Sequence, residues 1–172
     1  MTPRDLHHDD AARTASEGSG RFRSGVNPIM RYVTHLGGAR TTIFSGLALT
    51  IFGRGEREVG IALLAANGVT QIAVQALKRL VARRRPCDRA GRPLARISVP
   101  DPFSFPSGHS ATATALASTL AFAYPWILPM VVPAAVLVAA SRVTLGAHHL
   151  TDVLAGAALG VGGALVVRPL LS

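Results

Sequence analysis

The sequence predicts an all-α integral-membrane protein, a helical bundle of about five transmembrane helices preceded by an N-terminal amphipathic helix. Hydrophobic residues make up 49% of the chain but aromatic residues only 5%, which is typical of membrane helices whose small side chains let backbones pack closely. Two long stretches, residues 111–140 and 153–167, contain no charged residue. A helix that is apolar on every side belongs in lipid or in a core larger than a chain of 172 residues can build.

The N-terminal part of the chain differs in composition from the rest. Residues 1–24 are polar, mixed in charge and without an apolar run, so we expect a disordered tail and no cleavable signal peptide. Residues 25–172 then form one membrane-embedded domain, since domains commonly hold about 100–200 residues. Residues 28–38 place Arg31 and His35 among apolar side chains, which predicts a short amphipathic helix at the membrane interface.

Five apolar stretches follow, each predicted to be a membrane helix: residues 41–52, 59–77, 111–124, 127–140 and 153–167. Several are shorter than the roughly 20 residues that a span needs, so the prediction rests on the whole set. Tyr124-Pro125-Trp126 predicts a tight turn with aromatic side chains at the membrane surface. Gly156 and Gly160 form a G-x-x-x-G pair, a pattern of closely packed helix faces.

Polar residues gather at the ends of the apolar stretches. The first group, residues 78–86, is strongly basic, and on its own it is typical of a cluster that binds acidic lipid headgroups. The second group, Pro106-Ser107-Gly108-His109, opens the third stretch. On its own it fits a helix cap with an incidental histidine, although N–H groups at a helix start also bind anions.

The third group, Ser141 to Asp152, lies between the last two stretches and contains Arg142 and two histidines. If this segment is helical, Asp152 lies one turn after His148 and accepts a hydrogen bond from one ring nitrogen, which leaves the other nitrogen free to attack. His149 is also at a helical spacing from Asp152, so spacing alone does not choose between the histidines. Ionisable residues at the end of a membrane helix are costly and usually functional.

Chain topology allows the three groups to meet. Two further spans separate the loop after the second span from the loop after the fourth, so both loops lie on one membrane face. The basic group, the Ser107-Gly108-His109 segment and the Arg142 to Asp152 segment can therefore converge on one site. None of their separate structural interpretations predicts such a convergence.

Because of these three polar groups, the sequence resembles the type-2 phosphatidic acid phosphatase (PAP2) superfamily, in its membrane lipid phosphatase branch. The superfamily signature has three parts, K-x6-R-P, P-S-G-H and S-R-x5-H-x3-D. Here the parts run from Lys78 to Pro86, from Pro106 to His109 and from Ser141 to Asp152, each with its full spacing. The resemblance selects His148 over His149. Membrane relatives often have six spans, which leaves open whether the N-terminal segment adds a sixth membrane element.

The resemblance implies a lipid phosphatase with a phosphohistidine intermediate and without a metal or other cofactor. His148 would attack phosphorus with Asp152 orienting its ring, and His109 would protonate the leaving alkoxide and later activate water. The signature groups that would hold the non-bridging oxygens are Lys78, Arg85, Ser107, Gly108 and Arg142. A metal site built from His109, His148 and Asp152 is disfavoured, because the neighbouring cationic side chains oppose a further cation.

The expected partners are a lipid phosphate substrate and membrane lipids. Phosphatidate, phosphatidylglycerophosphate, a polyprenyl pyrophosphate and a polyprenyl-linked sugar phosphate all fit, and neither the substrate nor the oligomeric state follows from the sequence. Two alternatives stay open: a non-catalytic protein that binds lipid headgroups, and an enzyme like the vanadium-dependent haloperoxidases of the same superfamily, which the apolar helices disfavour. Nucleic acid is not an expected partner, since the basic residues lie beside membrane segments and lack interleaved aromatics.

Charge distribution predicts the orientation of the protein. With five spans, 15 of the 18 Lys and Arg residues fall on the face that carries the three polar groups, and leaving out Lys78, Arg85 and Arg142 gives 12 against 3 on the other face. Basic residues collect on the cytoplasmic side of membrane proteins. We therefore expect a bacterial plasma-membrane protein whose site opens at the cytoplasmic interface.

Overall fold

The computed structural model describes residues 28–99 and 101–171. Its helices are α2 (Pro28–Leu36), α3 (Ala39–Phe52), α4 (Arg57–Val81), α5 (Gly108–Ala123), α6 (Leu128–Thr144) and α7 (Leu150–Val167), with 3-10 turns at Pro125–Ile127 and Arg168–Leu171. Within the described residues there is no β-strand, and only two isolated bridges pair parts of the α4–α5 loop. The predicted tail, residues 1–24, lies outside the described residues.

The all-helical prediction is confirmed, since each of the five apolar stretches forms a helix, α3 to α7. Three segments are long and apolar enough to cross a membrane: Arg57–Val81, Pro125–Thr144 and Leu150–Leu171. The helix α3 is apolar but shorter, and α5 has only 16 residues. Helix length and composition therefore establish three candidate spans, not five.

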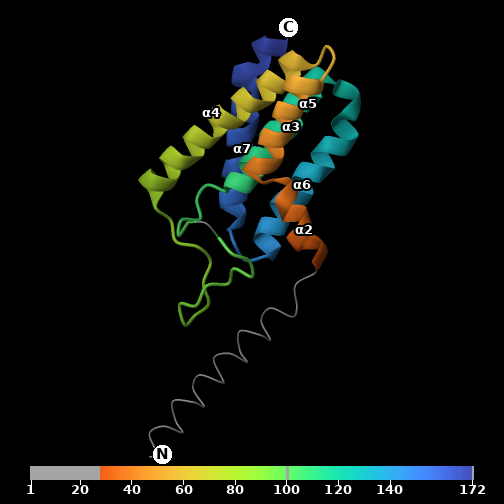
Figure 1. Ribbon diagram of the computed structural model, residues 1–172. Coiled ribbons are helices and arrows are strands. Elements are labelled where there is room, and N and C mark those ends of the chain that lie inside the picture. The colour runs from red at the N-terminus through yellow and green to blue at the C-terminus, as the bar shows by residue number, and fades with distance from the viewer. Residues whose placement is uncertain (1–27, 100, 172) are drawn as a thin grey trace, which may run out of the picture.

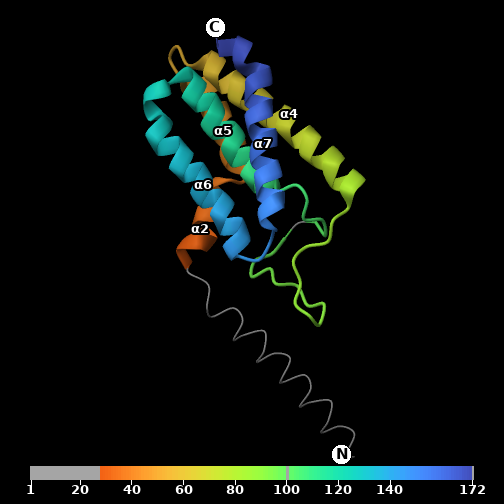
Figure 2. The same cartoon turned by 180° about the vertical axis from the view of Figure 1, so that it is seen from behind.

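The arrangement of the helices gathers the polar connections at one end of the bundle. In both views α5 lies between α6 and α7 (Figures 1 and 2). The long α4–α5 loop, the start of α5 and the α6–α7 turn all lie at the end where α2 is found, while the short α3–α4 and α5–α6 connections lie at the other end (Figure 1). The convergence predicted from topology is therefore present in the backbone.

The inside and the outside of the bundle differ in the size of their apolar side chains. Small residues such as Ala62, Ala111 and Ala115 are completely buried, whereas Phe44 is 70% and Phe52 81% exposed. In water such exposure of large apolar side chains would favour aggregation. Small residues inside and large apolar residues outside are what a helix bundle in lipid requires, which indicates an integral membrane protein.

Two glycines of α7 bring this helix into backbone contact with α5. A Cβ atom at Gly156 would collide with the carbonyl of Ser107, and one at Gly160 would collide with the carbonyl of Ala111. The predicted G-x-x-x-G packing face is thus confirmed. Its consequence is that the starts of α5 and α7 lie side by side, with the N–H of Ser107 donating to the carbonyl of Asp152 at 2.9 Å.

Candidate active site

Two cationic side chains and one carboxylate meet at the end of α4. Lys78 lies in the last turn of α4 with 8% of its side chain exposed, and its Nζ is 2.6 Å from Oδ2 of Asp101. Arg85, 9% exposed, contacts the same residue twice: Nη2 is 3.2 Å from Oδ1, and Nε donates to the backbone carbonyl at 2.9 Å. Ala82 ends α4 in the left-handed conformation, with φ 46°, and redirects the chain between these two cations.

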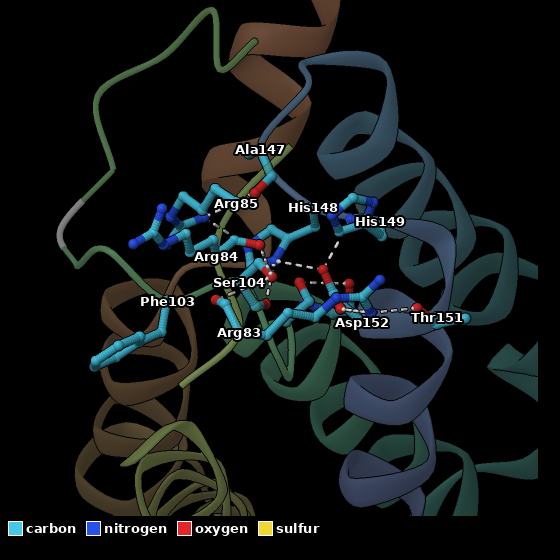
Figure 3. Close-up of polar contacts among 12 residues, drawn as sticks. Arg83, Arg84, Arg85, Phe103, Ser104, Ala147, His148, His149, Thr151 and Asp152 are labelled. Carbon is cyan, nitrogen blue, oxygen red and sulfur yellow. Dashed lines mark hydrogen bonds and ion pairs between the residues drawn. The ribbon is translucent and has the colours of Figure 1, made fainter. Parts of the chain in front are cut away.

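His148 lies in the turn between α6 and α7, and its side chain is 2% exposed. Its Nδ1 is 2.6 Å from the backbone carbonyl of Ser104, so Nδ1 carries the hydrogen, because a carbonyl only accepts. Nε2 then holds the lone pair and faces Nη1 of Arg85 at 3.3 Å. The same Nη1 donates to the carbonyl of Ala147 at 2.8 Å, which fixes the guanidinium beside the ring (Figure 3).

Asp152 does not make the hydrogen bond to His148 that the sequence led us to expect. That expectation assumed a helix through both residues, but Gly146, with φ 66°, follows the end of α6, and α7 starts only after His149. Oδ2 of Asp152 is consequently 3.9 Å from Nδ1 of His148, beyond hydrogen-bond reach. It accepts instead from the backbone N–H of His149 at 2.8 Å. The carbonyl of Ser104 fixes the tautomer in its place.

The other oxygen of Asp152 pairs with Arg83, which is outside the three-part signature. Nη1 of Arg83 is 2.9 Å from Oδ1 of Asp152 and 2.8 Å from the hydroxyl oxygen of Thr151. The Asp152 side chain is completely buried, whereas that of Arg83 is 40% exposed. Figure 3 shows Arg83 reaching from the α4–α5 loop to the start of α7. The three consecutive arginines therefore differ in their contacts. Arg85 contacts His148 and Arg83 contacts Asp152, whereas Arg84 is exposed.

The start of α5 contributes the second signature segment. Ser107 is completely buried and caps the helix, its Oγ accepting from the N–H of Ser110 at 3.4 Å and from the hydroxyl of Ser110 at 3.0 Å. The hydroxyl hydrogen of Ser107 remains available for donation. Gly108 and His109 occupy the first turn, where backbone N–H groups have no intrahelical partner. His109 is half-buried and lies in the electrostatic field of Lys78, Arg85 and Arg142.

Arg142 is the most deeply buried of these cations, with 1% exposure near the end of α6. Its Nη1 donates to the hydroxyl of Thr34 in α2 at 2.7 Å. Among the described residues its buried Nε has no hydrogen-bond partner. A buried charged donor without a partner is costly, and an anion beside it would supply the missing acceptor. The predicted amphipathic helix thus packs against α6 and contributes a residue to the site.

The cluster keeps His148 neutral. Burial, together with the nearby charges of Arg142, Arg85 and Lys78, lowers the pKa of His148 to about 3, although the hydrogen bond to the Ser104 carbonyl raises it. Asp101 responds in the opposite way to the same cations: burial raises its pKa, but Lys78 and Arg85 outweigh this and hold it below its ordinary value. The cluster therefore combines a neutral imidazole, an ionised carboxylate and an excess of positive charge.

Several residues of this cluster were missed by sequence reasoning: Thr34, Arg83, Asp101 and Ser104. Arg83 and Asp101 left a signal, since one belongs to the basic run and the other is an acidic residue in a proline-rich loop. Ser104 and Thr34 left none, because one acts through its backbone carbonyl and the other depends on tertiary packing. Across the described residues, no group of three or more His, Cys, Asp or Glu side chains could hold a metal ion.

Comparison with known proteins assigns this arrangement to a family. A family model of the PAP2 superfamily matches residues 59–171, which include all three signature segments. The chain belongs to the PAP2 superfamily. Membership confirms the resemblance derived from the signature, and the relatives, which are named as phosphatases of lipid and polyprenyl phosphates, identify the chain as an enzyme, a lipid phosphatase.

Individual relatives agree with this assignment. The chain is 32% identical to phosphatidylglycerophosphatase B of Bacillus subtilis, over 90% of this chain and 82% of the relative. It is 32% identical to the undecaprenyl-diphosphatase of Sulfolobus acidocaldarius, over 78% of this chain and 66% of the relative. The crystal structure of a transmembrane PAP2-type phosphatidylglycerolphosphate phosphatase from Bacillus subtilis matches with a TM-score of 0.67 at 30% identity, covering 92% of this chain and 85% of that one.

Proposed function

We propose that this PAP2 enzyme hydrolyses its lipid phosphate through a phosphohistidine at His148, without a metal ion. The observation that carries the proposal is the state of the His148 ring. Donation from Nδ1 to the Ser104 carbonyl leaves the lone pair on Nε2, and the lowered pKa keeps that lone pair unprotonated. A neutral imidazole whose free nitrogen faces a guanidinium suits attack on a phosphoryl group that the guanidinium also binds.

The reaction then has two steps. In the first, Nε2 of His148 attacks phosphorus in line, the bond from phosphorus to the lipid oxygen breaks, and His109 protonates the leaving alkoxide. In the second, His109 takes a proton from water, the water oxygen attacks phosphorus, and the phosphorus–nitrogen bond breaks to release inorganic phosphate. One histidine thus acts as nucleophile and the other as general acid and then general base.

The cationic side chains stabilise the charge on the transferring phosphoryl group, which is the main task in this chemistry. Lys78, Arg85 and Arg142 are the charged donors, and the Ser107 hydroxyl and the Gly108 N–H are the neutral ones. Nη1 of Arg85 lies 3.3 Å from Nε2, so it is placed to donate to a non-bridging oxygen when phosphorus approaches Nε2. The Nε of Arg142 has a hydrogen to offer the same group.

Asp152 supports the nucleophile from the Nδ1 side of the ring. Its oxygens are held by Arg83 and by the N–H of His149, and this fixes the first turn of α7 next to His148. At 3.9 Å from Nδ1, its charge also stabilises the positive ring that forms when Nε2 bonds to phosphorus. We therefore assign Asp152 an electrostatic and positioning role.

The proposed substrate is a membrane lipid that ends in a phosphate or diphosphate, either a glycerophospholipid or a polyprenyl carrier. The two relatives described above are named for one substrate of each kind, and the exposed large apolar side chains on the helices support a site that meets lipid headgroups. We further propose that residues 25–172 are the catalytic domain, that α3 to α7 are five membrane-embedded helices, and that the site opens to the cytoplasm of a bacterium.

A single assay tests this function. The detergent-solubilised enzyme is given phosphatidate, phosphatidylglycerophosphate and undecaprenyl diphosphate in EDTA, and phosphate release is measured with and without vanadate. We expect release from at least one lipid in EDTA, inhibition by vanadate, and loss of turnover in His148→Ala and His109→Ala. Lipid binding without turnover would support the headgroup binder instead, and vanadate-dependent halide oxidation would support a haloperoxidase. Activity that EDTA removes and a divalent metal restores would contradict the metal-free mechanism.

A further inference from the structure

Among the described residues, Asp101 is the one carboxylate outside the three-part signature that contacts two of the proposed phosphate-binding cations. It bridges Lys78 and Arg85, with one oxygen 2.6 Å from Nζ and the other 3.2 Å from Nη2. Both cationic side chains are less than one tenth exposed, whereas 28% of the Asp101 side chain is exposed. The mechanism described above does not use this residue.

The carboxylate is itself held in place. Its Oδ1 accepts a hydrogen bond from the N–H of Phe103 at 3.0 Å, and its own backbone carbonyl accepts from Nε of Arg85 at 2.9 Å. Backbone and side chain of Asp101 are thus bound at the same time to the loop and to Arg85. A carboxylate with this many fixed contacts is suited to remain in position when substrate binds.

Enough hydrogens remain on the two cations for a phosphate. An ammonium has three N–H donors and a guanidinium has five. Lys78 directs one of its three toward Asp101. Arg85 directs donors to Asp101, to the Ala147 carbonyl and toward Nε2 of His148, and the last of these can pass to a phosphate oxygen. Asp101 therefore does not use up the donors that substrate needs.

The negative charge of Asp101 offsets the repulsion between the cations around it. Lys78 and Arg85 repel one another, and Arg142 adds a third positive charge to the same buried region. Like charges that share a poorly solvated site move apart unless an anion lies between them. Asp101 supplies that anion through Nζ of Lys78 and Nη2 of Arg85, while Nη1 of Arg85 still faces Nε2 of His148, so both cations stay at the site.

We propose that Asp101 is a positioning residue of the phosphate site, whose fixed carboxylate holds Lys78 and Arg85 together and aims their remaining donors at the phosphoryl oxygens. This rests on the proposed function for the identity of the anion. It predicts that the carboxylate helps phosphate to bind even though it is itself negative. A carboxylate that merely filled the empty site would have the opposite effect, because substrate would have to displace it.

The test is the inhibition constant for vanadate in Asp101→Asn, which keeps the size of the side chain and removes its charge. We expect the constant to rise at least about tenfold, together with a higher KM for the lipid phosphate, because the two cations are no longer held at the oxygens. The matched control is Asp88→Asn. Asp88 lies in the same loop with the same 28% side-chain exposure, but its partner is Arg92, which is 80% exposed; its substitution should leave the vanadate constant unchanged.

Each other outcome overturns the proposal. A lower vanadate constant in Asp101→Asn would mean that the carboxylate competes with the anion, and an unchanged constant in a folded protein would mean that its role is structural only. If Asp101→Asn does not fold, Asp101→Glu decides the matter: it keeps the charge but shifts it by one methylene, so an unchanged constant would contradict positioning. Vanadate binding can also be followed by thermal shift, so this result stands apart from whether any lipid is turned over.

Discussion

At the scale of single residues, the tautomer of His148 is fixed by a backbone carbonyl, not by a carboxylate. The sequence placed His148 and Asp152 four residues apart and suggested a direct bond between them, yet Nδ1 binds the Ser104 carbonyl at 2.6 Å. Either partner leaves the lone pair on Nε2, so the chemical conclusion is the same. Asp152 instead accepts hydrogen bonds from Arg83 and from the backbone N–H of His149.

The protonation of His148 gives the first prediction. Its pKa of about 3 lies far below the ordinary value of 6.5, so we expect the ring of the empty enzyme to stay neutral down to about pH 4. NMR of enzyme labelled with 15N in its histidine rings, with His148→Ala used for assignment, measures this directly. A midpoint near pH 6.5 would contradict it.

The same shift has a consequence for stability. Between pH 6.5 and pH 3 the unfolded chain binds a proton at His148 that the folded protein does not bind. The contribution of this residue to the free energy of unfolding therefore decreases as the pH falls through that range.

A second prediction separates two neighbouring arginines. Removing Arg83 leaves Oδ1 of the buried Asp152 without its charged partner, and an unpaired buried acceptor costs about 1–3 kcal/mol. We expect Arg83→Met to lower kcat about tenfold or more and Arg83→Lys to restore part of the activity. The exposed Arg84 serves as control, and Arg84→Met should stay close to wild type. Equal effects of the two methionine variants would show that the basic run acts only through its total charge.

At the scale of helices, the sequence predicted the helices α3 to α7 better than the turn between α6 and α7. The apolar stretches became α3 to α7 because runs without charge have no stable place except inside a bundle or lipid. The helix assumed through His148 was wrong because Gly146 adopts a positive φ and ends α6, while His149 caps α7. Glycine after a helix is a known stop signal, so the end of α6 could have been predicted from the sequence. The contact of Arg142 with Thr34 was not, since it depends on how α2 packs.

The packing of α7 on α5 leads to the third prediction. A methyl group at Gly156 would meet the carbonyl of Ser107 and push apart the helix starts that carry the second and third signature segments. We expect Gly156→Ala to lower both the melting temperature in detergent and the activity. Gly162 is the matched control, because on the same helix it has no neighbour within 4 Å of an added Cβ; Gly162→Ala should stabilise by about 0.5–1 kcal/mol. Tolerance of alanine at both positions would contradict the close packing.

At the scale of the whole molecule, the basic residues divide between the two ends of the bundle. Arg54, Arg57 and Arg168 belong to the end opposite the site, whereas the arginines of the α4–α5 loop lie at the site end (Figure 1). On the basis of the positive-inside rule we propose that the site faces the cytoplasm. That orientation suits a lipid intermediate made inside the cell better than one recycled from outside.

The fourth prediction tests this orientation with one cysteine. The native Cys87 is exposed in the same loop, so it is first replaced in Cys87→Ser, and Arg89→Cys is added. We expect the new thiol to resist an impermeant maleimide in intact cells and to react after the membrane is permeabilised. Labelling in intact cells would place the site outside the cytoplasm.

The account of the whole enzyme depends on a covalent bond between phosphorus and Nε2 of His148. The most direct test is to quench the enzyme during turnover of a 32P-labelled lipid phosphate in EDTA, keep it at alkaline pH, where phosphohistidine survives, and locate the label by peptide mass spectrometry. The account predicts label on the peptide that contains His148, present in His149→Asn and absent in His148→Ala. Turnover without a labelled intermediate, or label that remains in His148→Ala, would contradict it.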